Sequence, residues 1–200
     1  MKRTSIVVLA VALVSACAST GGGEWTTLID GASGLDNFNR LGDANWRAAD
    51  GVVVADQGKG GFLVSKQSYR DFELYAEFYA ETTTNSGIFL RASDPQKITA
   101  ASSYEVNIFD QRPGPEYATA AIVDFARVPV PNIYFAGGKW NTFEITARGP
   151  TITVKFNGVQ TAQTSDGKFR AGPFALQYAT GANNIPGGAV KWRKVQVRPL

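Results

Sequence analysis

The stretch "DFELYAEFYAE", Asp71 to Glu81, decides the fold. Apolar side chains occupy every second position, and acidic or tyrosine side chains occupy the positions between them. Successive side chains of a β-strand point to opposite faces of its sheet, so a strict period of two predicts a strand with one face in a core. The other face meets water or a ligand. The apolar set is Phe72, Leu74, Ala76, Phe78 and Ala80.

Similar alternating runs recur along the chain and are separated by Gly, Pro, Asn and Asp, a pattern typical of all-β proteins. No helix of consequence is predicted. Without helices to cover a sheet, two sheets must cover each other. We therefore predict an all-β fold, a two-sheet jelly-roll sandwich over residues 25–200. Besides 71–81, the expected strands are 51–56, 61–66, 85–91, 104–110, 140–148, 151–156, 159–164, 173–180 and 189–200.

The first residues have the anatomy of an export signal. Lys2 and Arg3 precede the apolar run Ser5–Val14, which is too short to span a bilayer as a helix. The run leads into "VSAC", which ends at Cys17 and resembles a bacterial lipobox, in which the cysteine becomes the lipidated first residue. An ordinary cleaved signal with a chance cysteine is the alternative.

We therefore expect a signal peptide at residues 1–16, a flexible tether at 17–24 with lipidated Cys17, and the jelly-roll domain at 25–200. Ala18 follows the cysteine where an aspartate usually retains lipoproteins at the inner membrane. This favours a lipid-anchored protein of the cell envelope, at the outer membrane and facing the periplasm.

Composition excludes several function classes. The chain has 20 basic and 17 acidic residues, and loss of residues 1–16 leaves 18 basic residues that are scattered rather than clustered. Nucleic acid is therefore not an expected partner. The chain has no histidine and one cysteine, so histidine triads, histidine-metal sites and a cysteine nucleophile are excluded. Carboxylates, tyrosine, lysine and arginine remain for chemistry.

Two stretches suggest a site: "NSGIFLR" (Asn85 to Arg91) and "YEVNIFD" (Tyr104 to Asp110). Their isoleucine, leucine and valine residues are expected to face the core, so the polar residues between them face outward. If these strands share a sheet with residues 71–81, one outer face gathers acidic, amide and guanidinium groups among aromatic rings. The candidate catalytic residues are Glu105, Arg91, Glu77 and Asp110, and the candidate substrate-binding residues are Asn85, Asn107, Gln177, Tyr79 and Phe109.

Such a face suits a sugar, because hydroxyls need directional polar partners and sugar C–H faces stack on rings. Gly87 leaves a space where a ligand can approach the backbone. The alternative is an ordinary polar sheet surface with cross-strand pairs.

Eight stretches form an ordered set across nearly all of residues 25–200. They are "WTTLIDG" (25–31), "DFELYAEF" (71–78), "NSGIFLR" (85–91), "YEVNIFD" (104–110), "GKWNTFEITARG" (138–149), "ITVKFNG" (152–158), "ALQY" (175–178) and "WRKVQVRPL" (192–200). This set resembles the DUF1080 family, also called the 3-keto-disaccharide hydrolase domain. The resemblance implies a concanavalin A-like jelly roll related to family 16 glucanases, and activity on glycosides oxidised at the sugar 3-position.

The chain departs from that family in two places. Many members have a histidine soon after the "LQ" pair, where this chain has Tyr178. Many also have "TGAIYG", where this chain has "TAAIVDF" (Thr119 to Phe125). If those segments carry catalysis or metal binding, the activity has changed or been lost.

For a 3-keto glycoside, we expect Glu105 to act as the base and Arg91 to stabilise the developing oxyanion. Glu77 or Asp110 would supply a second acid, and the amide side chains would position hydroxyls. No cofactor is clearly required. Carboxylates and carbonyls could hold a divalent cation such as Ca²⁺ or Mg²⁺, but no cage-like spacing is evident and no metal ligands are assigned.

Two other functions stay open. A direct glycosidase uses two carboxylates, but Glu105 and Asp110 are five residues apart and would fall on opposite faces of a regular strand. A non-catalytic, lipid-anchored carbohydrate-binding module is the main rival, because jelly rolls often bind glycans without cutting them. In each case the expected partner is an oligosaccharide or a glycoside.

Overall fold

The computed structural model describes residues 22–182 and 185–200 of the 200-residue chain. The predicted signal peptide at 1–16 and Cys17 lie outside the described residues. Two short 3₁₀ helices are present, η1 (Leu35–Asn37) and η2 (Pro115–Tyr117). The strands are β1 (Thr26–Asp30), β2 (Phe38–Gly42), β3 (Arg47–Ala49), β4 (Val52–Ala55), β5 (Gly60–Ser65), β6 (Phe72–Ala80), β7 (Ser86–Leu90), β8 (Tyr104–Ile108), β9 (Lys139–Arg148), β10 (Thr151–Phe156), β11 (Val159–Ser165), β12 (Ala175–Ala179) and β13 (Val190–Pro199).

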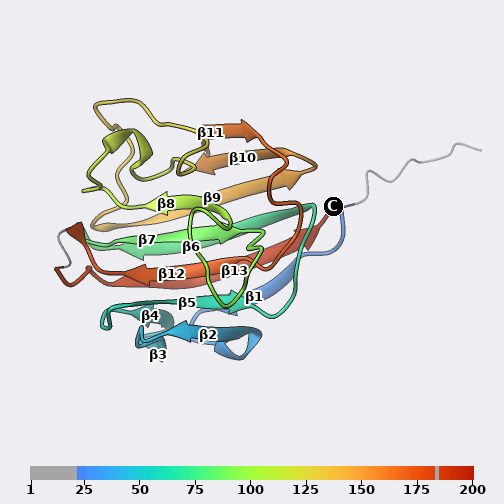
Figure 1. The fold of residues 1–200 in the computed structure, drawn as a ribbon. Helices are drawn as coiled ribbons and strands as arrows, with labels where there is room; N and C mark the ends of the chain where they lie inside the picture. Colours follow the sequence, from blue (N-terminus) through green and yellow to red (C-terminus); the bar gives the residue numbers. More distant parts are fainter. Residues whose placement is uncertain (1–21, 183–184) are drawn as a thin grey trace, which may run out of the picture.

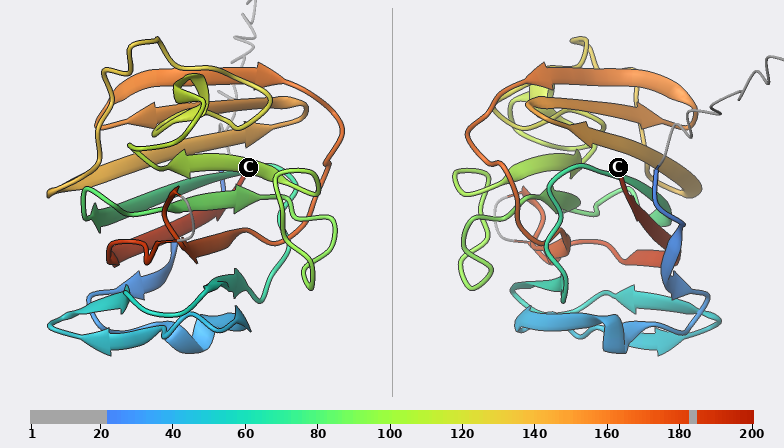
Figure 2. Two further views of the ribbon diagram at one scale, coloured as in Figure 1. Left: turned by 60° about the vertical axis from the view of Figure 1, so that its left-hand side comes forward. Right: turned by 90° about the vertical axis from the view of Figure 1, so that its right-hand side faces the viewer.

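The strands form two sheets that pack face to face (Figures 1 and 2). Sheet A has eight strands in the order β11-β10-β9-β6-β13-β4-β3, with β1 paired to β13. Sheet B has five strands in the order β2-β5-β12-β7-β8. The predicted all-β, two-sheet jelly-roll sandwich is confirmed.

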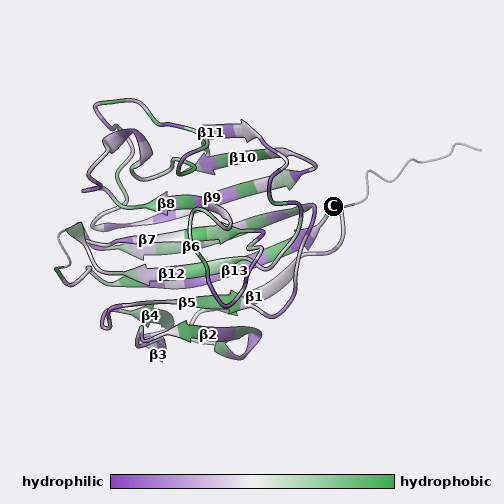
Figure 3. Cartoon of the chain, viewed as in Figure 1, coloured by the Kyte–Doolittle hydropathy of each residue, from purple (hydrophilic) through white to green (hydrophobic). Residues whose placement is uncertain are grey.

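The core lies between the sheets and is built by the predicted alternation. The apolar positions of β6 are buried while the positions between them are partly exposed, and Figure 3 shows this alternation as green and purple bands along the strands of sheet A. Phe78 of β6 stacks on Phe143 of β9 with ring centroids 5.1 Å apart, and its ring lies 5.5 Å from that of Trp192 of β13. Each buried ring of this size contributes about 1.5–3 kcal/mol relative to an exposed one.

The two ends of the domain lie side by side (Figure 1). β1 pairs antiparallel with β13, and the Gly23 amide donates a hydrogen bond of 2.7 Å to the Pro199 carbonyl. Among the described residues, no helix has the length and apolar character needed to cross a membrane.

The two sheets differ in what covers their outer faces. Loop 91–103 folds over sheet B, where Ile98 packs with Val64, Phe89 and Ala175 (Figure 1). A second long loop, 109–138, runs along the edge of sheet B formed by β8. There the Val123 amide donates a 2.9 Å hydrogen bond to the Glu105 carbonyl. As a result β7 and β8 are buried on both faces, whereas the outward side chains of β6 and β9 on sheet A remain partly or fully exposed.

Candidate functional site

The candidate site centres on Glu105, which points from β8 to the covered outer face of sheet B. Glu105 pairs with Phe89 of β7 in the sheet register, and only 8% of its surface is exposed. Its carboxyl lies beside Gly87: a Cβ atom on Gly87 would be 3.5 Å from both Cγ and Oε1 of Glu105. Glycine at this position therefore leaves the room beside the carboxyl that a larger residue would fill.

Burial raises the pKa of Glu105 to about 7, with the positive charge of Arg112 opposing the shift and the negative charge of Asp124 adding to it. Among the described residues, no protein group donates a hydrogen bond to this carboxyl. A carboxyl whose pKa lies near neutral pH can both take up and release a proton under physiological conditions. Glu105 therefore has the protonation behaviour of a general base or acid.

Two buried amide oxygens lie on the same face and also have no partner within the described part of the chain: Asn107 Oδ1 and Gln177 Oε1. Asn107 pairs with Gly87 across the sheet, and its Nδ2 donates a 2.6 Å hydrogen bond to the Tyr117 carbonyl, which fixes the orientation of the amide. The register of β12 against β7 places Gln177 opposite Gly87 on the other side. The three groups therefore surround one glycine.

All three groups share one chemical property, since each presents oxygen as a hydrogen-bond acceptor. A buried acceptor without a partner costs about 1–3 kcal/mol, so such groups are rare in native proteins unless a ligand or water completes them. A ligand that supplies several hydroxyl donors would satisfy them together. The site is thus suited to a polyhydroxylated molecule.

Three further predicted residues flank this face. Asn85 bridges to Ala179, and its Nδ2 donates a 2.6 Å hydrogen bond to the Thr180 carbonyl. Phe109 is buried just beyond the end of β8. Asn85 is partly buried and holds the start of β7 in place through this bond, while the buried Phe109 packs at the border of the face.

Asp110 closes the base of loop 109–138. Its carboxylate accepts hydrogen bonds from Thr119 Oγ1 at 2.6 Å, from the Ala136 amide at 2.9 Å and from the Gly137 amide at 2.8 Å. These bonds use both carboxylate oxygens. Asp110 therefore shapes the loop that covers the site.

Arg91 does not join the predicted cluster, and the expectation that it shares a face with Glu105 is wrong. Only 1% of Arg91 is exposed, and its guanidinium donates to the carbonyls of Arg70 at 2.7 Å and Gly149 at 2.8 Å. It also pairs with Asp71 at 3.2 Å. The backbone at Arg91 has φ 51°, a left-handed conformation that ends the strand alternation. The side chain consequently turns to the end of the sandwich.

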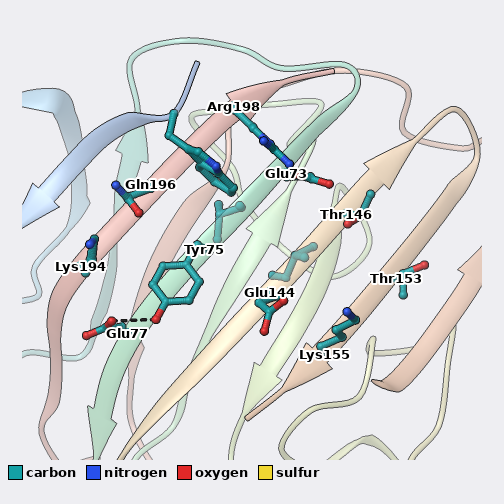
Figure 4. A pocket seen from close by; sticks show the side chains of 13 residues that line it. Glu73, Tyr75, Glu77, Glu144, Thr146, Thr153, Lys155, Lys194, Gln196 and Arg198 are labelled. Carbon is teal, nitrogen blue, oxygen red and sulfur yellow. Dashed lines mark hydrogen bonds and ion pairs between the residues drawn. The ribbon is translucent and has the colours of Figure 1, made fainter. Parts of the chain in front are cut away.

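Glu77 and Tyr79 also lie elsewhere, because β6 belongs to sheet A rather than to the sheet of β7 and β8. Glu77 accepts a 2.7 Å hydrogen bond from the Tyr75 hydroxyl (Figure 4) and pairs with Arg193 at 2.6 Å. Tyr79 packs against Trp140, with ring centroids 5.9 Å apart. Alternation correctly predicts which side of a strand faces outward, but it does not reveal which sheet the strand joins. The single predicted face is in fact two opposite faces.

The most prominent grooves in the described part of the chain do not contain Glu105. One groove of about 580 Å³ lies on the outer face of sheet A, and another of about 300 Å³ lies beside Arg91. We nevertheless place the candidate site at Glu105, because its carboxyl and the neighbouring amide oxygens lack partners. In the larger groove, by contrast, Glu73 and Glu77 are paired with arginines.

Sequence reasoning missed Arg112 and Asp124, the charged residues that act on Glu105. Both lie in the long loop after β8, where no periodicity predicts the direction of a side chain. Their only sequence signal was their position in a long loop, since such loops often carry function. Within residues 22–182 and 185–200, no group of three or more His, Cys, Asp or Glu side chains is arranged to hold a metal ion.

Comparison with solved structures shows a shared sandwich fold. Two proteins of Parabacteroides distasonis ATCC 8503, both provisionally named glycosyl hydrolases, superpose with TM-scores of 0.69 and 0.71 at 22% and 16% identity. The first match covers 88% of this chain and all of that chain, and the second covers 89% and 94%. The carbohydrate binding module CBM66 of Bacillus subtilis has a TM-score of 0.53 and 14% identity, over 89% of this chain and 93% of that chain.

No curated protein matches the sequence. The sequence does match one family across residues 24–198, which include every strand of both sheets except the last residue of β13. The chain therefore belongs to the family described as the 3-keto-alpha-glucoside-1,2-lyase-like domain.

Proposed function

We propose that this domain cleaves glycosides of 3-keto sugars, with Glu105 as the base that removes the proton from C2. The observation that carries the proposal is a buried carboxyl with a pKa of about 7 beside two buried amide oxygens without partners. Membership of a 3-keto-alpha-glucoside lyase-like family supports the substrate class.

The chemistry follows from the ketone at C3. The C2–H bond is acidic because the electron pair left on C2 delocalises into the carbonyl and forms an enolate. Once Glu105 has taken the proton, the enolate re-forms the ketone as the C1–O bond breaks, and the departing oxygen takes up a proton from water. The product is a 2-hydroxyglycal that carries the 3-ketone. Addition of water across C1 and C2 completes a net hydrolysis.

The neighbouring residues are assigned supporting roles. Asn107 Oδ1 and Gln177 Oε1 accept hydrogen bonds from sugar hydroxyls and so orient the ring. Arg112, rather than Arg91, is the cation whose charge acts on Glu105. We assign it the stabilisation of the enolate oxygen, because a fixed positive charge lowers the energy of the developing anion.

The test is incubation of the purified protein with 3-keto-trehalose and 3-keto-glucosides, followed by chromatography of the released sugar. Glu105→Gln should lower kcat/KM by about 10²–10⁴-fold, the usual contribution of a general base. For the wild type, kcat/KM should rise with pH through about 7, because the base acts only when ionised. Asp50→Asn, an exposed carboxylate in the β3–β4 turn, is the control and should leave turnover unchanged. Unchanged turnover in Glu105→Gln would contradict the assignment.

A non-catalytic carbohydrate-binding module is the second candidate. It is favoured by the absence of histidine from the chain. Tyr178, which stands where many family members have a histidine, is buried in the core. Binding of 3-keto-glycosides without release of any sugar would establish this function instead.

We also propose that the protein is anchored to the outer membrane by a lipid on Cys17 and faces the periplasm. The "VSAC" stretch and the preceding apolar run support this proposal. Metabolic labelling with radioactive palmitate should mark the wild type and not Cys17→Ser. Equal labelling of both would contradict it.

A further inference from the structure

The groove on the outer face of sheet A (Figure 4) is separate from Glu105, because Glu105 lies on β8 of sheet B. Its volume of about 580 Å³ falls in the range of about 300–1,000 Å³ that is usual for small-ligand sites. Side chains from β6, β9, β10 and β13 form its floor, and Trp25 borders it just before β1.

The strand register arranges the polar groups of the groove in rows. Tyr75 of β6 lies between Gln196 of β13 and Glu144 of β9, and Lys155 of β10 continues that row. Glu73 lies in the next row, between Arg198 and Thr146. Neighbouring strands are about 4.8 Å apart, so donors and acceptors repeat across the face. This repeat suits a ligand whose hydroxyls also repeat.

The charges of the groove nearly balance. Its lining holds three carboxylates and three cations: Glu73, Glu77, Glu144, Lys155, Lys194 and Arg198. Arg193 at the rim is a fourth cation. Arg198 pairs with Glu73, and Arg193 at the rim pairs with Glu77 at 2.6 Å. Within the described residues, Glu144 and Lys155 make no ion pair, so their oxygens and nitrogen remain available. The groove is therefore matched to a neutral ligand rather than to an anion or a cation.

Aromatic rings line the same face at intervals. Trp25 is 41% exposed and is held by the Arg198 guanidinium, 4.8 Å from its ring centroid. Trp140 of β9 is 37% exposed but lies outside the groove lining, and its ring packs against Tyr79 with the Arg193 guanidinium 4.3 Å from its centroid. Trp25 is therefore the exposed ring of the groove on which a sugar can stack.

We propose that this groove binds a neutral oligosaccharide, with a sugar face on Trp25 and its hydroxyls on Glu144, Lys155 and Gln196. The site is separate from the proposed cleavage site and does not depend on it. A glycan is favoured over a peptide or a charged ligand by three features of the groove. Its charges nearly balance, its hydrogen-bonding groups repeat across the strands, and the ring of Trp25 is exposed.

The test is calorimetric titration of the full-length purified protein with neutral hexasaccharides: cello-, malto-, laminari- and mannohexaose. At least one should bind, and Trp25→Ala should weaken its affinity at least tenfold. Glu144→Gln and Lys155→Gln replace exposed side chains, so they should fold normally, and we expect each to weaken binding about threefold or more. Phe135→Ala removes an exposed aromatic ring from loop 109–138 and is the matched control, which should bind as the wild type does.

Glu105→Gln separates this proposal from the proposed function. It should lose turnover of 3-keto-glycosides and keep hexasaccharide affinity. Three results would overturn the groove proposal: no hexasaccharide binds at millimolar concentration, binding survives all of the groove variants, or binding is lost in Glu105→Gln. A wild type that binds hexasaccharides but cleaves no 3-keto-glycoside would leave the groove proposal standing and remove the proposed cleavage.

Discussion

The two outer faces of the sandwich shift the pKa of a glutamate in opposite directions. Glu105 on sheet B is buried beneath loops, and burial raises its pKa to about 7. Glu77 on sheet A is partly exposed, and the hydrogen bond from Tyr75 together with the bond from Arg193 lowers its pKa below the usual value. Because desolvation disfavours the charged form and a charge partner favours it, only the covered face offers a carboxyl poised near neutral pH. Proton transfer near neutral pH is therefore suited to the covered face of sheet B.

The largest expected effect concerns Arg91, which belongs to neither face. Arg91→Met leaves the carbonyls of Arg70 and Gly149 without their donor. Removing one partner of a buried ionic network costs about 3–5 kcal/mol, so the free energy of unfolding in urea should fall by that amount. Arg170→Met alters an exposed arginine that lines the same small cavity and should change stability by less than about 0.5 kcal/mol. An equal loss of unfolding free energy in the two variants would mean that the buried hydrogen bonds of Arg91 do not stabilise the fold.

A smaller effect, on the order of 3 kcal/mol, should come from the ionisation of Glu105. Its pKa is raised in the folded state, so the unfolded state loses its proton first as pH rises above about 4.3. Stability should therefore fall between about pH 4.3 and pH 7 and level off above the folded pKa of about 7. Unfolding free energies measured at pH 5 and pH 8 should drop more for the wild type than for Glu105→Gln. Parallel pH profiles would show that Glu105 is not desolvated.

The smallest effect is expected on the open face. Glu73→Gln breaks the ion pair with Arg198. The side chain of Glu73 is 26% exposed and that of Arg198 is 35% exposed. Ion pairs on a surface contribute about 0–1 kcal/mol, so unfolding in urea should shift by no more than this. The difference from the wild type should shrink further in 1 M salt, where the Debye length is about 3 Å. A loss above about 2 kcal/mol would show that this face is more buried than its exposure indicates.

The sequence was sufficient to predict which side chains of a strand face the core and which face outward. It placed the apolar residues of β6, β7, β8 and β12 in the core, and it placed Glu105, Asn107 and Gln177 together on an outward face. β1, β2 and β3 were not predicted, because most of their residues are exposed and carry little apolar pattern.

The full composition of the candidate site could not be predicted, because it depends on which strands pair with each other. The alternation of side chains does not specify this pairing. Glu77 and Glu105 have the same outward direction on their strands, yet β6 and β8 belong to different sheets. The position of Arg91 depends on one left-handed backbone angle, which nothing in "NSGIFLR" reveals. The groove on the outer face of sheet A could not be predicted either, because it forms where β6 pairs with both β9 and β13.

The bonds that Asp110 makes at the base of loop 109–138 have a consequence for how members of this fold can diverge. One carboxylate joins both ends of the loop, and Gly137 admits it closely, since a Cβ there would be 3.1 Å from Asp110 Oδ2. Residues 118–123 between those ends are buried and bond to β8, so the loop can gain, lose or exchange residues in its exposed stretches, such as 129–133, while β8 and β9 keep their positions. The cover of Glu105 can thus diverge at its surface without any change in the sandwich.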